Sequence, residues 1–139
     1  MAQALSEYCI YTIVKKETLE AAEKQSGNFS NTEKRAWVTG FALWQKAQAK
    51  HVGMPILFGD AADCSQLIYW GVLTEVRVVG DGTEYSVDRV RKLSPSLSPQ
   101  DLVLRSTGKA ISQGFIRPYA ICKTPSFLEY AQTVHGGID

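Results

Sequence analysis

The sequence is poor in the residues that build disulfide frameworks and many catalytic or metal centres. Its 139 residues include three cysteines (Cys9, Cys64 and Cys122) and two histidines (His51 and His135). The cysteines are odd in number and far apart, with no C-x-x-C pair, so neither a disulfide framework nor a zinc site is expected. The sequence also has no phosphate-binding P-loop, no G-x-G-x-x-G and no G-x-S-x-G. We therefore expect no metal or cofactor and no catalysis by the protein itself.

A charge excess and a long apolar run are absent as well. Fifteen Lys and Arg against fourteen Asp and Glu give a formal net charge of +1, so no global field points to nucleic acid or a membrane. No apolar run approaches the ~18 residues of a membrane-spanning helix, and the N-terminus lacks a basic region followed by an apolar one. These features predict a soluble cytoplasmic protein with one domain, whose core extends from about residue 8 to 130.

A local charge asymmetry lies between Tyr85 and Lys123. This stretch carries seven cations and two anions, a local excess of five positive charges. The cations are Arg89, Arg91, Lys92, Arg105, Lys109, Arg117 and Lys123, and the anions are Asp88 and Asp101. Such an excess predicts either a patch that binds phosphates or a solvated surface whose counter-charges come from other parts of the fold.

Apolar patterns place most of the strands. Residues 8–14 are apolar on both faces, which is typical of a central strand. Residues 15–25 are strong helix formers and predict a short, mostly exposed helix. Residues 54–58 and 67–79 read as two strands, the second apolar on both faces in its first half and alternating in its second half. Gly80-Asp81-Gly82 predicts a hairpin that returns through a further strand.

A Trp-rich helix is expected between the short helix at residues 15–25 and the strand that starts at residue 54. Ser30 and Glu33 have the spacing of a capping box, which predicts a helix from there to about His51. Five positions form one continuous stripe on that helix: Trp37, Gly40, Phe41, Trp44 and Ala47. Such a stripe predicts a helix packed across a sheet. Gly40 lowers the helix propensity, so we expect a close backbone approach there.

The last third is expected to hold turns and short strands. Two Ser-Pro pairs in residues 90–100 predict a turn region, with a short helix capped by Ser98 and started by Pro99. Residues 102–106 and 115–123 read as strands. Six or so strands, mostly in hairpins, with helices near the first strand and the end, predict an α+β domain built on a small, strongly curved, mixed or antiparallel β-barrel.

Two stretches resemble a known superfamily. Gly53 to Phe58 (GMPILF) followed by Ile68 to Val76 (IYWGVLTEV) looks like the pair of central barrel strands in EVE and ASCH domains, which belong with YTH domains to the PUA-like superfamily. The segment Ser26-Gly27-Asn28-Phe29 with Trp37 is a looser likeness to EVE domains. The resemblance implies a PUA-like fold that binds RNA or a modified base in DNA, with a pocket between the helical crossover and the barrel.

Candidate binding residues follow from what such a ligand requires. A single-stranded or flipped base needs an aromatic face, polar groups for its edge and cations for its phosphates. The aromatic candidates are Phe29, Trp37 and Trp70, the candidates for reading a base edge are Asn28, Asp60 and Ser65, and the candidate phosphate contacts are Arg89, Arg91, Arg117 and Lys123, with Tyr119 on the same strand face. Each has a structural alternative, since the tryptophans can belong to the core and the polar residues can stabilise turns.

Two other functions stay open. One is a protein-interaction or small-ligand domain that docks a partner on its Tyr119 surface or forms a homodimer. The other is an enzyme acting on nucleotides. It would use a Cys64 and His51 couple, because thiolate catalysis needs a base within reach. Alternatively, Asp60 and Asp63 in one loop could form a carboxylate pair, which can shift its own pKa values or hold a hard cation.

Overall fold

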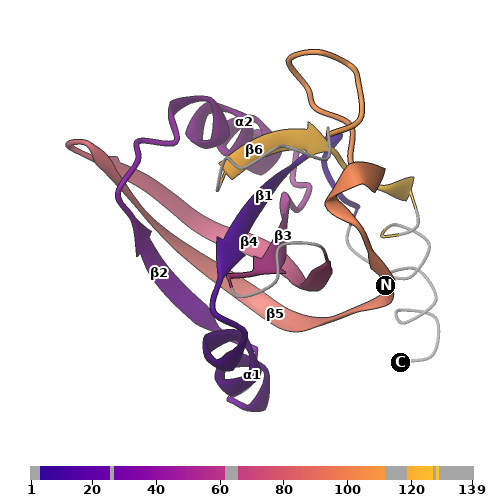
Figure 1. Cartoon of the computed structure of the whole chain (residues 1–139). Coiled ribbons are helices and arrows are strands. Elements are labelled where there is room, and N and C mark those ends of the chain that lie inside the picture. The colour runs from indigo at the N-terminus through magenta and orange to yellow at the C-terminus, as the bar shows by residue number, and fades with distance from the viewer. Residues whose placement is uncertain (1–3, 26, 62–65, 112–118, 127, 129–139) are drawn as a thin grey trace.

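The computed structural model describes residues 4–25, 27–61, 66–111, 119–126 and 128, apart from the side chains of residues 94–97. Its elements, in chain order, are β1 (Tyr8–Val14), α1 (Lys16–Lys24), β2 (Phe29–Glu33), α2 (Val38–Ala49), β3 (Pro55–Asp60), β4 (Leu67–Val79), β5 (Gly82–Leu97), the 3-10 helix η1 (Pro99–Asp101) and β6 (Tyr119–Lys123). The strands form one sheet in the order β2-β5-β4-β3-β1-β6 (Figure 1). Only β1 and β3 run parallel among these neighbours, and the other pairs are antiparallel.

The predicted α+β class is confirmed, whereas a closed barrel is not observed. Among the described residues, β2 and β6 are the two edges of the sheet and do not pair with each other. The sheet nevertheless bends, and Figure 1 shows β5 curving along its length. Three register shifts between β4 and β5, all within residues 67–75 of β4, account for part of this bend, since bulges bend strands and increase their twist.

Side chains fill the gap between the ends of the curved sheet. Trp37 is stacked between Tyr85 of β5, at 4.9 Å between ring centroids, and Tyr119 of β6, at 4.7 Å. These strands are near opposite ends of the strand order. The Thr12 hydroxyl of β1 also donates to the Glu33 carboxylate of β2 at 3.2 Å. We call Tyr85, Trp37 and Tyr119 the aromatic stack; it joins strands that share no backbone hydrogen bonds.

Two apolar clusters make up the core. The first includes Ile10, Phe58 and the Trp37 ring, and partly buried residues of α2 pack against it. The second includes Trp70 and Cys122. The predicted strands at residues 8–14 and 67–79 are confirmed with these bounds. Both faces of the first half of β4 are covered as expected, since residues 67–73 are buried or half-buried.

The prediction that a helix starts at Ser30 is wrong. Residues 29–33 form β2, and α2 begins only at Val38. The Ser30 hydroxyl shares a hydrogen bond of 2.9 Å with the Ser86 hydroxyl of β5 rather than capping a helix. The Glu33 carboxylate reaches Thr12 of β1. Pairing with β5 therefore outcompetes the local capping signal, because a strand edge offers backbone partners to every second residue.

The turn region predicted at residues 90–100 is also largely a strand. Residues 90–97 continue β5, with Lys92 opposite Tyr69 and Leu97 opposite Leu67. The expected short helix is confirmed as η1, where Ser98 and Asp101 form a capping box. Residues 102–106 contribute only isolated bridges instead of a strand. Of the predicted strand 115–123, residues 119–123 form β6, and the remainder lies outside the described residues.

The close approach predicted at Gly40 is made by side chains and not by backbone. A Cβ atom added there would lie 2.8 Å from the Tyr119 hydroxyl and 3.1 Å from Ile10 Cδ1. The glycine therefore lets α2 come close to β1 and β6. In the part of the chain that the structure describes, no helix is both long and apolar enough to cross a membrane.

One buried hydroxyl fixes the segment that leads into α2. Thr83 is 1% exposed; its oxygen accepts a hydrogen bond from the Trp37 amide at 2.8 Å and donates one to the Arg35 carbonyl at 2.7 Å. Thr83→Val keeps the shape but leaves both backbone groups unpaired, so we expect the free energy of unfolding to fall by about 1–3 kcal/mol. Thr83→Ser keeps the hydroxyl and is expected to lose only about 1 kcal/mol for the missing methyl. Urea denaturation that gives the two variants equal stability would contradict this role.

Candidate functional site

The predicted aromatic residues are placed inside the fold. Trp37 is 1% exposed and both faces of its ring are covered by the aromatic stack. Phe29 packs edge-on against Phe58 at 5.8 Å and against Tyr85 at 6.2 Å between ring centroids. Trp70 is buried in the second core cluster beneath the Arg91 guanidinium, 4.1 Å from the ring centroid. A base could therefore stack on Trp37 or Trp70 only after the fold rearranged, whereas the Phe29 ring is half-buried.

The predicted polar and charged residues that the structure describes are spread over several strands and the segment before β2. Arg89 is exposed next to Asp88, with 3.9 Å between Nε and Oδ2. Arg91 is half-buried against Trp70, and this burial together with Arg89 lowers the pKa of its guanidinium. Asp60 is half-buried at the end of β3, and Asn28 is exposed before β2. Ser65 and Arg117 lie outside the described residues, as do Asp63 and Cys64, so neither proposed catalytic pair can be examined.

Tyr119 and Lys123 share one face of β6. Tyr119 and Ile121, at alternate positions, pack against the first core cluster, whereas Ala120 and Cys122 belong to the second. Lys123 continues the Tyr119 face because successive side chains of a strand alternate. The Tyr119 hydroxyl lies against Gly40, and burial raises its pKa to about 12. At neutral pH this hydroxyl therefore stays protonated. Of the predicted residues, Trp37, Tyr119 and Lys123 are thus brought to the side of the sheet that α2 covers.

Two neighbouring hollows run along one side of α2. The first, of about 410 Å³, is lined by Arg35, Ala36, Val38, Thr39, Leu104, Arg105, Ser106, Tyr119, Ala120 and Ile121. The second, of about 350 Å³, is lined by Leu5, Ser6, Glu7, Tyr8, Leu43, Lys46, Ala47, Lys50, Val52 and Arg105. Arg105 borders both hollows, so they form one continuous surface. We call the two hollows together the basic groove.

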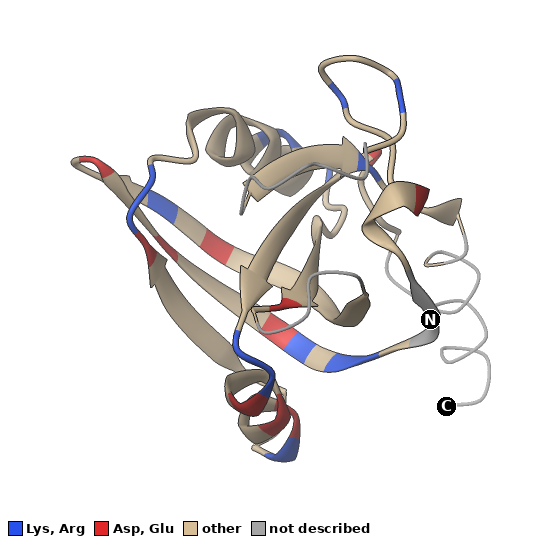
Figure 2. Cartoon of the chain, viewed as in Figure 1, with Lys and Arg blue, Asp and Glu red and all other residues tan. Residues whose placement is uncertain are grey.

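Positive charge dominates the basic groove. Its lining holds four cations and one anion: Arg35, Lys46, Lys50 and Arg105 against Glu7. All five side chains are exposed. Figure 2 shows Lys and Arg along α2, in the loop between η1 and β6, and at the end of β6. The ion pairs found among the described residues involve none of these four cations. Arg35 still interacts electrostatically with the Glu33 carboxylate, whose pKa is raised by burial and lowered by the Arg35 charge.

The backbone holds these cations in place. The Arg105 amide donates to the Ile121 carbonyl of β6 at 2.9 Å, and its guanidinium lies 5.2 Å from the centroid of the Tyr8 ring. This cation–π contact turns the side chain toward β1. The Arg35 carbonyl is bound by the buried Thr83 hydroxyl. Lys46 and Lys50 are four residues apart on α2 and so lie on one side of that helix.

The other hollows carry charges of both signs. A hollow between α1 and the first half of β4 has Lys16, Lys24 and Lys92 beside Glu20 and Glu23. Its charges largely compensate one another, as the Lys16–Glu20 ion pair at 3.9 Å illustrates. A shallow hollow over β2, β5 and β4 has Arg77 between Glu75 and Glu84 in its lining.

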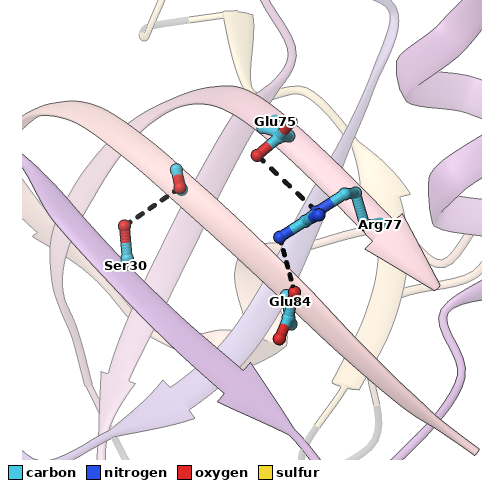
Figure 3. Close-up of polar contacts among 5 residues, drawn as sticks. Ser30, Glu75, Arg77 and Glu84 are labelled. Atoms are coloured by element: carbon cyan, nitrogen blue, oxygen red, sulfur yellow. Dashed lines mark hydrogen bonds and ion pairs between the residues drawn. The ribbon is translucent and has the colours of Figure 1, made fainter. Parts of the chain in front are cut away.

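In the hollow over β2, β5 and β4, the Arg77 side chain points between two carboxylates, those of Glu75 and Glu84 (Figure 3). Its Nη2 atom lies 2.7 Å from Glu84, and its Nε atom lies 3.8 Å from Glu75. Ser30 and Ser86 continue the polar row. Arg77 is therefore an arginine whose charge is already compensated by ion pairs, which Arg105 lacks among the described residues.

Sequence reasoning missed most of the basic groove. Arg105 and Tyr119 were in the predicted charge-rich stretch, but Arg35, Lys46 and Lys50 precede it in the chain, and Tyr8 belongs to the first strand. The i, i+4 spacing of Lys46 and Lys50, off the apolar stripe, was the available signal for part of it. Within the described residues, no three His, Cys, Asp or Glu side chains lie close enough together to hold a metal ion.

Comparisons with known proteins add no family assignment: no family model, no curated protein and no solved structure matches the chain.

Proposed function

We propose that the protein binds single-stranded nucleic acid along the basic groove. The observation that carries this proposal is the continuity of two hollows through Arg105, with four exposed cations and one anion in their lining. Phosphate backbones are bound mainly by such rows of Lys and Arg, and this term accounts for most binding without sequence preference. Arg35 and Arg105 can each offer two parallel donors to a phosphate, whereas Lys46 and Lys50 act as point charges.

The length of the groove suits a short single strand. The groove follows α2, and a 12-residue helix is about 18 Å long at ~1.5 Å per residue. At the ~3.4 Å that separates stacked nucleotides of one strand, this length corresponds to about five nucleotides. The volumes of about 410 and 350 Å³ are each in the range of small-ligand pockets, so each hollow has room for a base or a phosphate.

Apolar surface in the groove supports contacts with bases. Val38 is 67% exposed at the start of α2 and lines the first hollow. Leu104 and Ile121 line the same hollow, and the half-buried Tyr8 ring lines the second. The PUA-like resemblance remains part of the proposal, because the first hollow lies between the start of α2 and β6, where that resemblance implies a pocket. On this proposal the base pocket and the phosphate track are parts of one surface.

The proposal is tested by fluorescence anisotropy with labelled single-stranded RNA, single-stranded DNA and duplexes with and without a modified base. With four phosphate contacts, the logarithm of the binding constant should fall against the logarithm of the salt concentration with a slope of about −3, from ~0.7 per phosphate for single strands. Competition by unlabelled oligonucleotide but not by dextran sulfate of equal charge is expected. Absence of binding, or binding unaffected by salt, contradicts the proposal, and tighter binding of duplexes assigns the groove a different nucleic acid.

A further inference from the structure

We infer that Cys9 and Cys122 are a redox pair that forms a reversible disulfide between β1 and β6. The two residues are directly opposite each other in the antiparallel register of these strands. Both are free thiols, and both are 0% exposed. Both side chains belong to the second core cluster, so they lie on the same face of the sheet. This inference is independent of the proposed function.

The backbone geometry fixes the separation of the pair. The Thr124 amide donates to the Glu7 carbonyl at 2.8 Å, which makes these two opposite residues a hydrogen-bonded pair. Such pairs alternate along antiparallel strands, so Cys9 and Cys122, two positions further on, are also hydrogen-bonded, with their Cα atoms about 5.5 Å apart. Disulfides join Cα atoms that are roughly 4.4–6.8 Å apart. The backbone separation therefore permits a bond.

The side chains need a small movement to react. The Cys9 sulfur lies 3.8 Å from the carbonyl oxygen of Lys123, which places it beside β6. Opposite Cβ atoms in a sheet are about 4.5–5.5 Å apart, whereas a disulfide needs about 3.5–4.5 Å. β6 can supply this movement, because it is a five-residue strand at the edge of the sheet. Among the described residues, its outer side is held by residues 103–105 through two backbone hydrogen bonds, from Arg105 to Ile121 at 2.9 Å and from Lys123 to Val103 at 2.8 Å. The remaining strain makes the disulfide easier to reduce than an unstrained one.

The reaction with oxidised glutathione balances in two steps. One cysteine thiolate attacks the disulfide of oxidised glutathione, forms a mixed disulfide and releases one glutathione thiolate. The second cysteine then displaces the bound glutathione and forms the Cys9–Cys122 bond. Two protein thiols lose two protons and two electrons, and one oxidised glutathione becomes two reduced molecules. Burial raises the pKa of both thiols, that of Cys122 to about 12, so reaction at neutral pH is slow and proceeds when β6 opens.

The experiment uses a Cys64→Ser variant, which retains only the two opposed cysteines of the three in the chain. After incubation of the folded protein with oxidised glutathione, peptide mapping should find Cys9 and Cys122 linked within one chain, and dithiothreitol should restore both thiols. The melting temperature of the oxidised form should exceed that of the reduced form, because the bond closes a loop containing most of the chain. The same mapping of the wild-type protein provides a second measurement that requires no substitution.

Cys122→Ser in the same background is the matched control and should give at most a glutathione adduct on Cys9. Two results would overturn the inference. In one, both thiols of the folded protein stay free under conditions that oxidise the urea-unfolded chain. In the other, the cysteines link only between separate chains.

Discussion

Trp37→Ala is expected to lower the free energy of unfolding by about 3–5 kcal/mol, the range for deleting a large buried aromatic side chain. Three features place it in this range. Trp37 is 1% exposed, its ring is stacked on both faces, and its ring fills the space between β5 and β6. These strands share no backbone hydrogen bonds, so the substitution removes the ring contacts that connect β5 with β6 and leaves a cavity between them. Urea denaturation followed by far-UV circular dichroism measures this loss.

Trp44→Ala is the matched control for that prediction. Trp44 lies on α2, which begins just after Trp37; it is only half-buried and contacts the Phe41 ring at a tilted 6.2 Å between centroids. The same atoms are removed in both variants, so a larger loss for Trp37→Ala reports the stacked position rather than tryptophan as such. Trp37→Phe keeps one aromatic ring and should give an intermediate stability. Equal losses for Trp37→Ala and Trp44→Ala would show that the stack does not hold the sheet ends together.

Sequence alone could place the strands whose own pattern of apolar residues shows which of their faces are buried. Residues 67–73 are apolar at every position except Gly71, and only a strand covered on both sides can bury them in a chain of this size. Their bounds therefore followed directly. Gly40 was informative for a similar reason, because a glycine inside a helix is unfavourable unless something comes close to it, and here Tyr119 does.

Elements decided by distant partners could not be placed in this way. Ser30 and Glu33 satisfy the local rule for starting a helix, yet their side chains bond to β5 and β1 instead. Residues 90–97 contain a Ser-Pro pair typical of turns, yet they extend β5 because the apolar first half of β4 needs a neighbour along its length. In both cases strand pairing, which depends on residues far away in the sequence, outweighs a local preference.

The candidate site shows the same limit more strongly. Closeness in sequence suggested that Arg91 and Lys123 belong to one cationic patch, but Arg91 lies against the second core cluster, whereas Lys123 continues the face of β6 that packs against the first. Arg91 packs on Trp70, whereas Lys123 is opposite Tyr8 in the β1–β6 register. The cations that do come together, Arg35 and Arg105, are joined by the curvature of the sheet and by the position of α2. The sequence spacing of Arg35 and Arg105 therefore could not predict that they lie close together.

Replacing both arginines of the first hollow, Arg35→Gln with Arg105→Gln, is expected to weaken binding of single-stranded nucleic acid about 100-fold. Each charge-assisted hydrogen bond to a phosphate contributes about 1.5 kcal/mol, which is roughly tenfold in affinity. The salt slope should become less steep by about 1.4, at ~0.7 for each lost phosphate contact. Both side chains are exposed and outside the ion pairs of the described residues. Stability should therefore change by no more than about 0.5 kcal/mol.

Arg77→Gln with Arg89→Gln is the control that separates the groove from net charge. It removes the same two charges, but from arginines that already lie near carboxylates, Arg77 at 2.7 Å from Glu84 and Arg89 at 3.9 Å from Asp88. If the groove binds the ligand, this pair should change the affinity by less than about threefold, since exposed ion pairs contribute little. Equal weakening by both pairs would mean that overall charge, and no particular surface, attracts the nucleic acid. Stronger weakening by the control pair would place the ligand on β4 and β5, because only a surface there depends on Arg77 and Arg89.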